Sequence, residues 1–406
     1  MKRVAVIGGG ASGMIAAICA SENGAQVTIF EHNSELGRKL LMTGNGKCNL
    51  TNMQLLLSAY YSDCKERLND FFTQFDNNST IEFFRRIGLV VSEKNGYVYP
   101  YSEQSLTVRD VLLRKIESLK IEVITDTDIT SISKENDVFT VIDRNESGVF
   151  DSIILACGSY AGIQKKDRIE SNRDGYSLAY YLGAKIDNVK PVLTGIICKD
   201  EYFKDISGVR ATANIIIRGK DGSEYHDTGE IQFADYGISG IPVFGLSHII
   251  SEGNPDDYEI EIDLFPSMSD EEYLQFMRTR LLAYQGETVS SFFLGLINSK
   301  LSACMMKLSS LKDNDIVDID DDRIIDAITY MRYLKATPKS VRSFEHAQCA
   351  MGGVSLKQID SNCMLKENPG VYMCGELLNV DGKCGGYNLQ WAWTTGYIAG
   401  TKAALN

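Results

Sequence analysis

The first thirty residues alternate short apolar runs with a glycine-rich turn. Residues 3–7 predict a short buried strand, residues 11–23 predict a helix whose small side chains face inward, and residues 26–31 predict a second strand. A run of glycines separates the first strand from the helix. This order predicts a βαβ unit at the start of the sequence.

Helical and strand patterns continue to alternate up to about residue 190. The pattern is helical over residues 60–84 and 105–119. A strand at residues 122–125, a β-ribbon around 132–143 and a β-rich run over 150–156 follow. These elements extend the opening unit into a Rossmann-like α/β domain.

The pattern changes near residues 190–195. Strand-like runs separated by glycine-containing turns continue to about residue 265, residues 269–310 predict two helices, and a further helix follows residue 322. We therefore predict an inserted substrate or cap domain that interrupts the first domain. The predicted domains are residues 1–190 with 347–406, and an insert, 191–346, that is β-rich over 191–265 and about 330–346 and helical over about 268–328.

The composition is that of an ordinary globular enzyme. The chain has 406 residues, of which 44% are hydrophobic and 23% charged, and no apolar run is long enough for a membrane span. A net charge of −13 disfavours nucleic acid as a partner, because nucleic-acid affinity comes largely from clustered Lys and Arg. We expect neither nucleic acid nor membrane as a partner, and the sequence indicates no oligomeric state.

The ten cysteines are scattered singly and form no C-x-x-C pair, which favours reduced thiols in a reducing compartment. Residues 1–20 imitate a secretory leader, but glycines interrupt the apolar stretch. We therefore expect a cytoplasmic protein. Six aspartates within residues 313–322 lack the order of ligands and glycine of a calcium loop, so a solvated loop or helix start is the better interpretation, and no metal is expected.

Residues 8–13, Gly-Gly-Gly-Ala-Ser-Gly, satisfy the G-x-G-x-x-G pattern of dinucleotide-binding turns. Gly8 makes the tight turn, Gly10 lets the backbone approach a pyrophosphate, and Gly13 lets the helix pack on the strand. Glu31 ends the second strand, where a carboxylate can accept hydrogen bonds from ribose hydroxyls. Together these residues predict a dinucleotide site, without separating NAD from FAD.

Three later segments favour FAD. Gly37-Arg38-Lys39 follows the second strand, an arrangement common where a long flavin dinucleotide continues past the pyrophosphate. Residues 153–158 resemble the strand-to-glycine segment that crosses near the pyrophosphate in flavoproteins with two dinucleotide folds. Residues 370–376 form a strand ending in Gly-Glu, and Gly385-Gly386 then opens a helix. The positive end of that helix would stabilise an anionic reduced flavin.

Two long runs carry a resemblance to a known family. They are residues 43–52, TGNGKCNLTN, and residues 382–392, GKCGGYNLQWA. The sequence resembles the BaiN/YhiN-like flavoproteins, also described as aminoacetone-oxidase-like FAD-dependent oxidoreductases. The resemblance implies a Rossmann-like FAD/NAD(P)-binding α/β domain with three layers, two of β-sheet and one of helices (ββα), interrupted by an inserted β-barrel-like and helical module. Shorter matches lie at residues 96–102, 174–175, 237–240 and 352–354.

Carried over residue by residue, the resemblance implies a cofactor site built from several distant segments. The dinucleotide is placed on the N-terminal turn and the residues after the second strand, and the flavin beside the two long runs. The implied cofactor-binding residues are Gly8, Gly10, Ala11, Ser12, Gly13, Glu31, Arg38, Lys39, Asn45, Gly46, Lys47, Cys48, Asn49, Ile129, Ala156, Cys157, Gly158, Gly375, Glu376, Gly386, Tyr387, Asn388, Leu389 and Gln390.

The chain departs from the family's usual pattern in three places. Lys47 stands where the loop usually has Arg, and residues 233–235, Phe-Ala-Asp, stand where the insert motif usually begins Phe-Thr-His. Ala350 replaces a common Thr before Gly352. The segments in the insert and before Gly352 are expected to face the active site, so the substrate is not carried over from the family.

Candidate catalytic groups are few. His346 could be a general acid, although a lone histidine is more often structural. Cys48 beside the flavin could be a redox thiol, but it has no partner cysteine nearby in the sequence. Tyr387 and Asp235 are possible proton donors. The flavin can carry the reaction, with the protein supplying orientation and electrostatics.

We predict an FAD-dependent oxidoreductase that transfers a hydride between flavin and a small organic substrate held between the two domains. The resemblance favours a reductase of an activated double bond with NAD(P)H as transient electron donor. The presence of a single G-x-G-x-x-G turn favours instead a flavin amine oxidase that uses oxygen. Weaker alternatives are a tRNA-modifying flavoprotein, an NAD-dependent dehydrogenase without flavin and a redox-sensing module.

Overall fold

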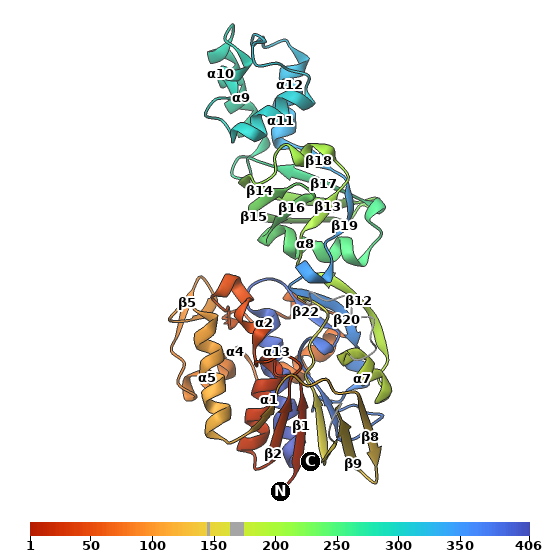
Figure 1. Ribbon diagram of the computed structural model, residues 1–406. Helices are drawn as coiled ribbons and strands as arrows, with labels where there is room; N and C mark the ends of the chain where they lie inside the picture. The colour runs from red at the N-terminus through yellow and green to blue at the C-terminus, as the bar shows by residue number, and fades with distance from the viewer. Residues whose placement is uncertain (144–146, 163–173) are drawn as a thin grey trace. The chain divides into compact units, whose positions relative to one another are not determined.

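The computed structural model describes residues 1–143, 147–162 and 174–406 of the chain. The chain forms two compact units (Figure 1). The first contains Met1–Lys190 and Cys349–Asn406, and the second contains Pro191–Gln348. The chain therefore leaves the first unit, forms the second and returns.

A five-stranded parallel sheet is the centre of the first unit. Its strand order is β21-β11-β1-β2-β7, and each neighbouring pair is parallel. The middle strands are buried on both faces, which explains their continuous apolar sequence. The strands are β1 (Arg3–Ile7), β2 (Gln26–Phe30), β7 (Glu122–Ile124), β11 (Ser152–Leu155) and β21 (Val371–Met373).

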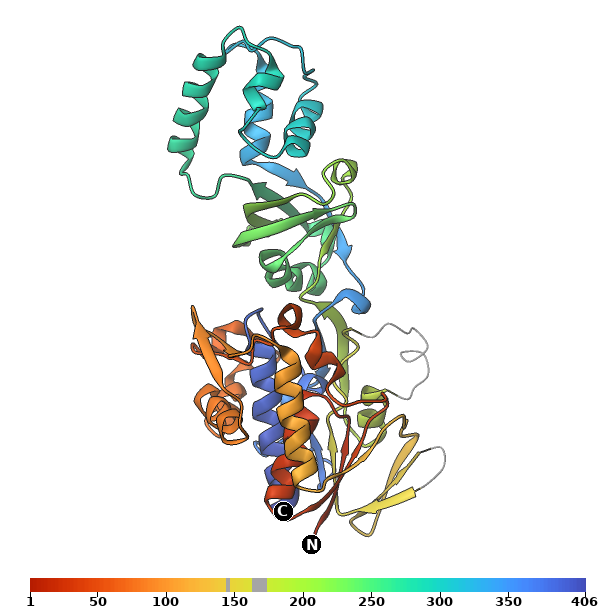
Figure 2. The same ribbon diagram turned by 60° about the vertical axis from the view of Figure 1, so that its left-hand side comes forward.

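Helices cover one face of this sheet and an antiparallel meander covers the other (Figure 2). The meander consists of β8 (Ser131–Glu135), β9 (Val138–Ile142) and β10 (Ser147–Phe150). On the helical face, α1 (Ala11–Glu22) packs against α5 (Ser105–Ser118) and against α13 at the C-terminus. The predicted three-layer Rossmann-like fold is confirmed.

The contact between α1 and α13 (Tyr387–Leu405) is very close. A Cβ atom added at Gly400 would lie 2.1 Å from the carbonyl oxygen of Ala16, and one at Gly396 would lie 2.5 Å from that of Ser12. Residue numbers increase together along the two helices, so the helices run parallel here. Their N-terminal ends therefore point to the same end of the sheet, where parallel strands terminate and ligands bind in such folds.

Residues 60–84 do not form the predicted continuous helix. They contain β4 (Tyr60–Ser62), α3 (Leu68–Phe72) and the start of α4 (Asn77–Arg86). Asp76 begins α4 by accepting the backbone N–H of Ser79 at 2.8 Å, which is a standard helix start. A local cap and a strand partner supplied by distant residues thus override the helical pattern of the sequence.

Two small sheets join early and late segments of the first unit. β4 pairs with β22 (Val380–Gly382), while β3 (Thr51–Asn52) pairs with β6 (Tyr97–Pro100), which also pairs with β5 (Val91–Lys94). A further pair joins β12 (Ile186–Val192) to β20 (Cys349–Val354), and α2 (Arg38–Leu41) and α7 (Gly175–Tyr181) complete the unit.

A curled antiparallel sheet with strand order β18-β17-β14-β15-β16-β13-β19 forms the core of the second unit. α8 (Ile241–Glu252) packs on β15 and β16 and lies inside the stretch that was expected to contain strands only. Pro242 in its first turn suits a helix start, and the helix is apolar nearly all round, so periodicity alone does not distinguish it from buried strands. The strands are β13 (Ile196–Cys198), β14 (Arg210–Gly219), β15 (Glu224–Ala234), β16 (Gly237–Gly240), β17 (Tyr258–Asp263), β18 (Leu334–Ala336) and β19 (Pro338–Val341).

The helical part of the second unit has three helices over the region where two were predicted. They are α9 (Asp270–Tyr284), α10 (Val289–Phe293) and α11 (Ser299–Leu308), and α12 (Asp322–Arg332) follows the acidic stretch. Asp321 from that stretch caps α12. Within the described ranges, no group of His, Cys, Asp and Glu has the placement of a metal site, and no helix is both long and apolar enough to cross a bilayer.

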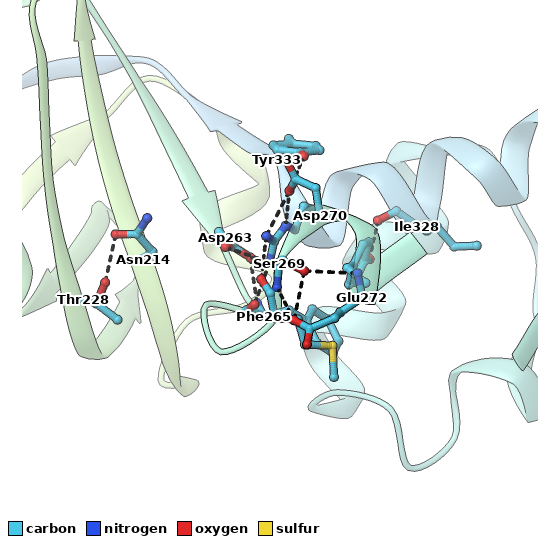
Figure 3. A network of polar contacts seen from close by, with 12 residues as sticks. Asn214, Thr228, Asp263, Phe265, Ser269, Asp270, Glu272, Ile328 and Tyr333 are labelled. Carbon is cyan, nitrogen blue, oxygen red and sulfur yellow. Dashed lines mark hydrogen bonds and ion pairs between the residues drawn. The ribbon is translucent and has the colours of Figure 1, made fainter. Parts of the chain in front are cut away.

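A buried arginine ties the strands of the second unit to its helices, and Figure 3 shows its acidic partners Asp263 and Asp270 in the polar network at this junction. Arg332, at the end of α12, lies 3.1 Å from Asp263 of β17 and 3.0 Å from Asp270 of α9. Its guanidinium also donates to the carbonyl oxygens of Phe265 and Met268 at 2.6 and 2.8 Å. Because the side chain is only 9% exposed, this network fixes the junction between β17, α9 and α12.

Candidate functional site

The N-terminal glycine turn follows β1 and is tightly packed except at one position. A Cβ atom at Gly8 would lie 2.4 Å from the carbonyl oxygen of Ala156, and one at Gly13 would lie 1.9 Å from that of Gly8. A Cβ at Gly10 would meet no atom within 4 Å. Gly8 and Gly13 are therefore needed for packing, while Gly10 borders open space that a ligand's pyrophosphate can approach.

The start of α1 lies against the C-terminal Gly-Glu segment. A Cβ at Gly375 would lie 2.5 Å from Oγ of Ser12, and the backbone N–H of Gly375 donates to Thr395 of α13 at 2.9 Å. The first turn of α1, which contains Ala11, has no acidic residue and no side-chain cap. Its backbone N–H groups are thus available to an anion.

Glu31 is buried directly after β2. Oε2 accepts the backbone N–H of Gly9 at 2.7 Å, and Oε1 accepts the backbone N–H of Asn33 at 2.8 Å. Burial opposes ionisation, but hydrogen bonds from His32, Asn33 and Gly9 hold the pKa of Glu31 below its usual value. The carboxylate is charged and Oε2 keeps acceptor capacity for a hydroxyl.

The loop that contains Ile129 lies next to Glu31. The backbone N–H of Thr127 donates to the carbonyl oxygen of Glu31 at 3.1 Å, and that of Asp126 donates to Asn33 at 3.0 Å. Ile129 itself is 4% exposed. The structure therefore brings the segment around Ile129, one of the implied cofactor-binding residues, to the end of β2.

Residues 156–158 follow β11 and lie beside the glycine turn. Ala156 contacts Gly8, as described above, and the Cys157 thiol donates to the carbonyl oxygen of Ile7 at 3.3 Å. Gly158 has φ +71°, and a Cβ there would meet nothing within 4 Å. Gly158 therefore borders open space, as Gly10 does.

Lys39 and Glu376, predicted as separate cofactor contacts, form an ion pair. Lys39 Nζ lies 2.6 Å from Glu376 Oε2, and Ser159 Oγ donates to the same oxygen at 2.7 Å. Burial lowers the pKa of Lys39, but the Glu376 carboxylate outweighs burial, and the pKa of Lys39 is raised above its usual value. Arg38 points elsewhere and is exposed, with one hydrogen bond of 3.3 Å to Asn33.

The loop of residues 43–52 has an unusual backbone. Asn45 and Cys48 have positive φ values of 54° and 58°, and Gly44 and Gly46 share this left-handed conformation. Gly46 is a third glycine beside open space, since a Cβ there would meet nothing within 4 Å. The glycines and asparagine of this run suit a conformation that other residues rarely adopt.

This loop contacts the C-terminal run directly. Thr51 Oγ1 donates to the Gln390 side chain at 2.6 Å, and the Asn52 amide donates to the carbonyl oxygen of Gly385 at 3.1 Å. A Cβ at Gly386 would lie 2.6 Å from the backbone of Thr51. The two rare sequence runs therefore form one structural feature around the N-terminus of α13.

Several predicted side chains of this feature are used in packing. The Gln390 amide also donates to Thr394, and the Tyr387 hydroxyl donates to the carbonyl oxygen of Gln54 at 3.0 Å. Asn388 binds the backbone N–H and carbonyl of Gly382 at 2.8 and 2.7 Å. Cofactor contacts from this run would then come from the uncapped first turn of α13.

Other candidates are also placed by the structure. Leu389 packs against the core, and Asn49, with its amide nitrogen toward Val98, accepts the N–H of Gly386 at 3.3 Å. Cys48 is fully buried, which raises the pKa of its thiol to about 12 and argues against a reactive thiolate.

Three candidates lie at exposed positions. Lys47 forms an ion pair with Glu103 at 2.7 Å, in a recess that Tyr97 and Tyr99 also line. Its ammonium group is therefore already paired within the protein. Asp235 and His346 belong to the second unit and are both exposed.

Taken together, the residues of the first unit fit FAD. Open space borders Gly10, Gly46 and Gly158, and two helices present uncapped N-termini toward the same end of the sheet. A dinucleotide pyrophosphate suits the first of these helix ends, and the electron-rich edge of a flavin suits the second.

Comparison with known proteins identifies the family. The family model described as HI0933-like protein Rossmann domain matches residues 2–402, which is nearly the whole chain. The chain belongs to the HI0933-like family. The resemblance inferred from the two rare runs is confirmed, and so is the predicted class, an FAD-dependent oxidoreductase.

Two curated relatives of this HI0933-like chain match along nearly their full length. A 3-dehydro-bile acid delta(4,6)-reductase from Clostridium scindens is 34% identical over 100% of this chain and 99% of its own. A ribosomal RNA dihydrouridine synthase from Haemophilus influenzae is 24% identical over 97% of this chain and 96% of its own. Among solved structures, a 3-ketosteroid delta1-dehydrogenase from Sterolibacterium denitrificans has a TM-score of 0.50 at 11% identity, with both chains covered completely, and shares the fold.

Four residues near the site were missed by the sequence analysis of this HI0933-like chain. The backbone of Gly9 binds Glu31. Ser159, Tyr176 and Cys349 all bind Glu376. The Tyr176 hydroxyl donates to the Glu376 carbonyl oxygen at 3.3 Å, and the Cys349 thiol donates to its Oε1 at 3.4 Å. Burial and the nearby carboxylate raise the pKa of Cys349 well above its usual value, so the thiol stays protonated. The sequence could have pointed to Tyr176, because this residue directly follows the family match at residues 174–175.

We expect Glu376→Gln to weaken FAD binding by about tenfold, because the Lys39 ammonium loses the carboxylate that positions it beside the candidate dinucleotide site. Fluorescence titration of the apoprotein with FAD measures this. Glu103→Gln is the matched control, since it breaks an equally short but exposed pair with Lys47. Equal dissociation constants for the two variants would contradict the assignment of Glu376 to the site.

Proposed function

We propose that this protein uses FAD and NAD(P)H to saturate a carbon–carbon double bond conjugated to a carbonyl group in a small, largely apolar molecule. The carrying observation is the 34% identity, over the whole of both chains, to an enzyme named as a reductase of a bile acid. The identity to the ribosomal RNA dihydrouridine synthase is ten percentage points lower, 24% against 34%.

The two relatives have different substrates but related chemistry. Their names describe a delta(4,6)-reductase and a synthase of dihydrouridine. Dihydrouridine is formed from uridine when two hydrogens are added across a carbon–carbon double bond that is conjugated to a carbonyl. Addition of a hydride and a proton to such a bond is common to both. This shared chemistry supports a reductase over the alternative amine oxidase that uses oxygen.

The residues of the site suit this reaction. When bound, FAD supplies hydride transfer, accepting a hydride from a donor and delivering it to an electron-poor carbon. The backbone N–H groups at the start of α1 would hold the pyrophosphate, and Glu31 would bind ribose hydroxyls. The N-terminal end of α13 would place a positive potential beside the flavin and favour its reduced form.

The electron donor is proposed to bind transiently. The sequence contains one G-x-G-x-x-G turn of this quality, at residues 8–13, and this turn is part of the proposed FAD site. NADH or NADPH would therefore bind without a Rossmann domain of its own. The single turn by itself favours the oxidase, so the reductase proposed here requires a donor that binds only transiently.

RNA is the competing substrate class, since one family member modifies ribosomal RNA. The net charge of −13 favours a small molecule, because RNA binding depends on Lys and Arg that neutralise phosphates. We therefore propose a small-molecule enone or dienone as the substrate, and treat RNA as a tested alternative.

Anaerobic stopped-flow absorbance tests the proposal. We expect NADH or NADPH to bleach the FAD of the purified holoenzyme, and a steroid 4,6-dien-3-one to restore the oxidised spectrum much faster than air does. Failure of both nucleotides to bleach the flavin would exclude the reductase. Reoxidation by unmodified ribosomal RNA but by no dienone would replace the small-molecule proposal with RNA modification, and reduction by amines would favour the oxidase.

A further inference from the structure

One arginine of the second unit is held in place without an acidic partner. Within the parts of the chain that the structure describes, Arg85, Arg278 and Arg342 are the arginines whose guanidinium forms neither a hydrogen bond nor an ion pair. Arg85 and Arg278 are exposed, whereas Arg342 is half-buried. This is unusual in a chain with 54 acidic and 41 basic residues.

The Arg342 side chain lies over an aromatic ring. Its guanidinium carbon is 4.6 Å from the centroid of the Tyr236 ring, a cation–π contact that fixes the plane of the group while leaving its N–H donors free. Arg342 directly follows β19, and Tyr236 lies in the turn between β15 and β16. Two separate parts of the sheet thus supply the pair.

Backbone contacts hold both residues. The N–H of Arg342 donates to the carbonyl oxygen of Gly195 at 2.9 Å, and the carbonyl oxygen of Tyr236 accepts the N–H of Cys198 at 2.8 Å. A Cβ at position 195 would lie 2.8 Å from the Tyr236 hydroxyl oxygen, so Gly195 leaves the space that the ring occupies. The arginine, the tyrosine and the glycine therefore form one preorganised feature.

Neighbouring carboxylates do not neutralise this arginine. Asp235 and Glu345 are close in sequence to the pair, yet both are exposed and neither forms an ion pair with Arg342. A planar guanidinium with free donors matches the geometry of a carboxylate or phosphate. Holding it half-buried and unpaired costs desolvation that a bound oxyanion would offset.

We propose that Arg342, stacked on Tyr236, binds an oxyanionic group of a ligand and that this group is the carboxylate of an acidic substrate. The identification of the ligand as substrate rests on the proposed function, in which a relative acts on a bile acid and a bile acid carries a carboxylate on an apolar body. The phosphate of NADPH is the other source of the same chemistry.

The test compares an acid with its neutral ester in the holoenzyme. The probes are a 3-oxo-4,6-diene steroid acid and its methyl ester, which share the reacting dienone. We expect Arg342→Gln to raise KM and the calorimetric Kd for the acid by about 10-fold to 100-fold, the size of a charge-assisted hydrogen bond, and to leave the ester and kcat unchanged. Arg342→Lys keeps the positive charge but loses the paired N–H donors of the planar guanidinium. This variant should therefore bind the acid more tightly than Arg342→Gln does, and less tightly than the wild type.

The control is Arg278→Gln, which removes another unpaired arginine of the second unit and should alter neither ligand. If Arg342→Gln instead weakens the binding of NADPH but not of NADH, the oxyanion bound by Arg342 is the phosphate of NADPH. The oxyanion site is then supported, but its ligand is the nucleotide and not the substrate. Equal effects on acid and ester, or no effect on any of the four ligands, would overturn the site.

Failure of the proposed function is distinguishable from failure of the site. If the wild type reduces neither acid nor ester, the proposed reaction is wrong, while calorimetry still reports whether the acid binds more tightly than the ester through Arg342. Unchanged circular dichroism and thermal midpoint of Arg342→Lys show that folding is intact. The preference is the ratio of the Kd for the ester to the Kd for the acid. If this ratio is the same in the wild type, in Arg342→Gln and in a folded Arg342→Lys, the proposal is contradicted.

Discussion

Gly13→Ala is expected to abolish FAD binding and, with it, enzymatic activity. The new Cβ would lie 1.9 Å from the carbonyl oxygen of Gly8 and 3.2 Å from the Cβ of Ala156, so α1 would have to move away from the glycine turn. The obstructing atoms of Gly8 belong to the backbone and cannot rotate aside. The displacement should also destabilise the apoprotein by about 1–3 kcal/mol, as overpacking of a core does.

Gly10→Ala is the matched partner of this variant. Gly10 has φ −76°, which alanine adopts readily, and its Cβ would meet no protein atom within 4 Å. The apoprotein should therefore keep its stability, while FAD binding weakens because the methyl group occupies the space left for the pyrophosphate. Thermal unfolding without FAD and titration with FAD separate the two effects. An unchanged FAD dissociation constant in Gly10→Ala would show that the dinucleotide does not pass this turn.

Local patterns in the sequence predicted the parts of the fold whose partners are close in the chain. The opening strand, helix and strand were expected at residues 3–7, 11–23 and 26–31, and the structure has them within two residues of these bounds. Each has a short buried run next to a glycine turn. The short range of these determinants explains the agreement.

Elements that depend on distant partners were missed. β4 at residues 60–62 is a strand only because β22 at residues 380–382 pairs with it. The partner of β4 is not visible in a local window of sequence. α8 was missed for another reason: β15 and β16 directly precede it in the chain, but the helix is apolar nearly all round, so its pattern does not distinguish it from a buried strand.

The same distinction applies to the candidate site. The sequence indicated Lys39 and Glu376 as two members of the site, but their ion pair spans 337 residues and could not be read from spacing. Gln390 and Asn388 were expected to contact the flavin, but their side chains bind Thr51 and Gly382. Motifs thus indicate a candidate site, while side-chain partners require the three-dimensional structure.

Arg332→Met is expected to destabilise the second unit by about 3–5 kcal/mol, because removing one partner of a buried ion pair leaves the other charge uncompensated. The remaining charge is Asp263, which is 7% exposed. Burial already raises its pKa, while the backbone N–H of Phe265 and the charge of Arg332 oppose that rise. Without Arg332 the pKa of Asp263 should rise further.

This rise determines how the loss depends on pH. Above the raised pKa the variant contains a buried, unpaired carboxylate and the full loss applies; as the pH falls through that pKa, Asp263 takes up a proton and the difference from the wild type shrinks. Asp263→Asn added to the Arg332→Met background removes the charge and should recover part of the stability at neutral pH. A loss independent of pH would instead indicate that packing of the arginine stem dominates.

The molecule supplies both a control and a local readout for this experiment. Arg323→Met changes the same residue type at the other end of α12, where the side chain is 45% exposed, and should cause no measurable loss. Both tryptophans of the chain, Trp391 and Trp393, lie in α13 of the first unit. Denaturation of Arg332→Met should therefore begin at lower urea in the circular dichroism of the whole chain, to which the helices α9 to α12 contribute, while tryptophan fluorescence changes at its wild-type midpoint. Coincident shifts of both signals would show that the two units unfold together, and the destabilisation would then belong to the whole chain.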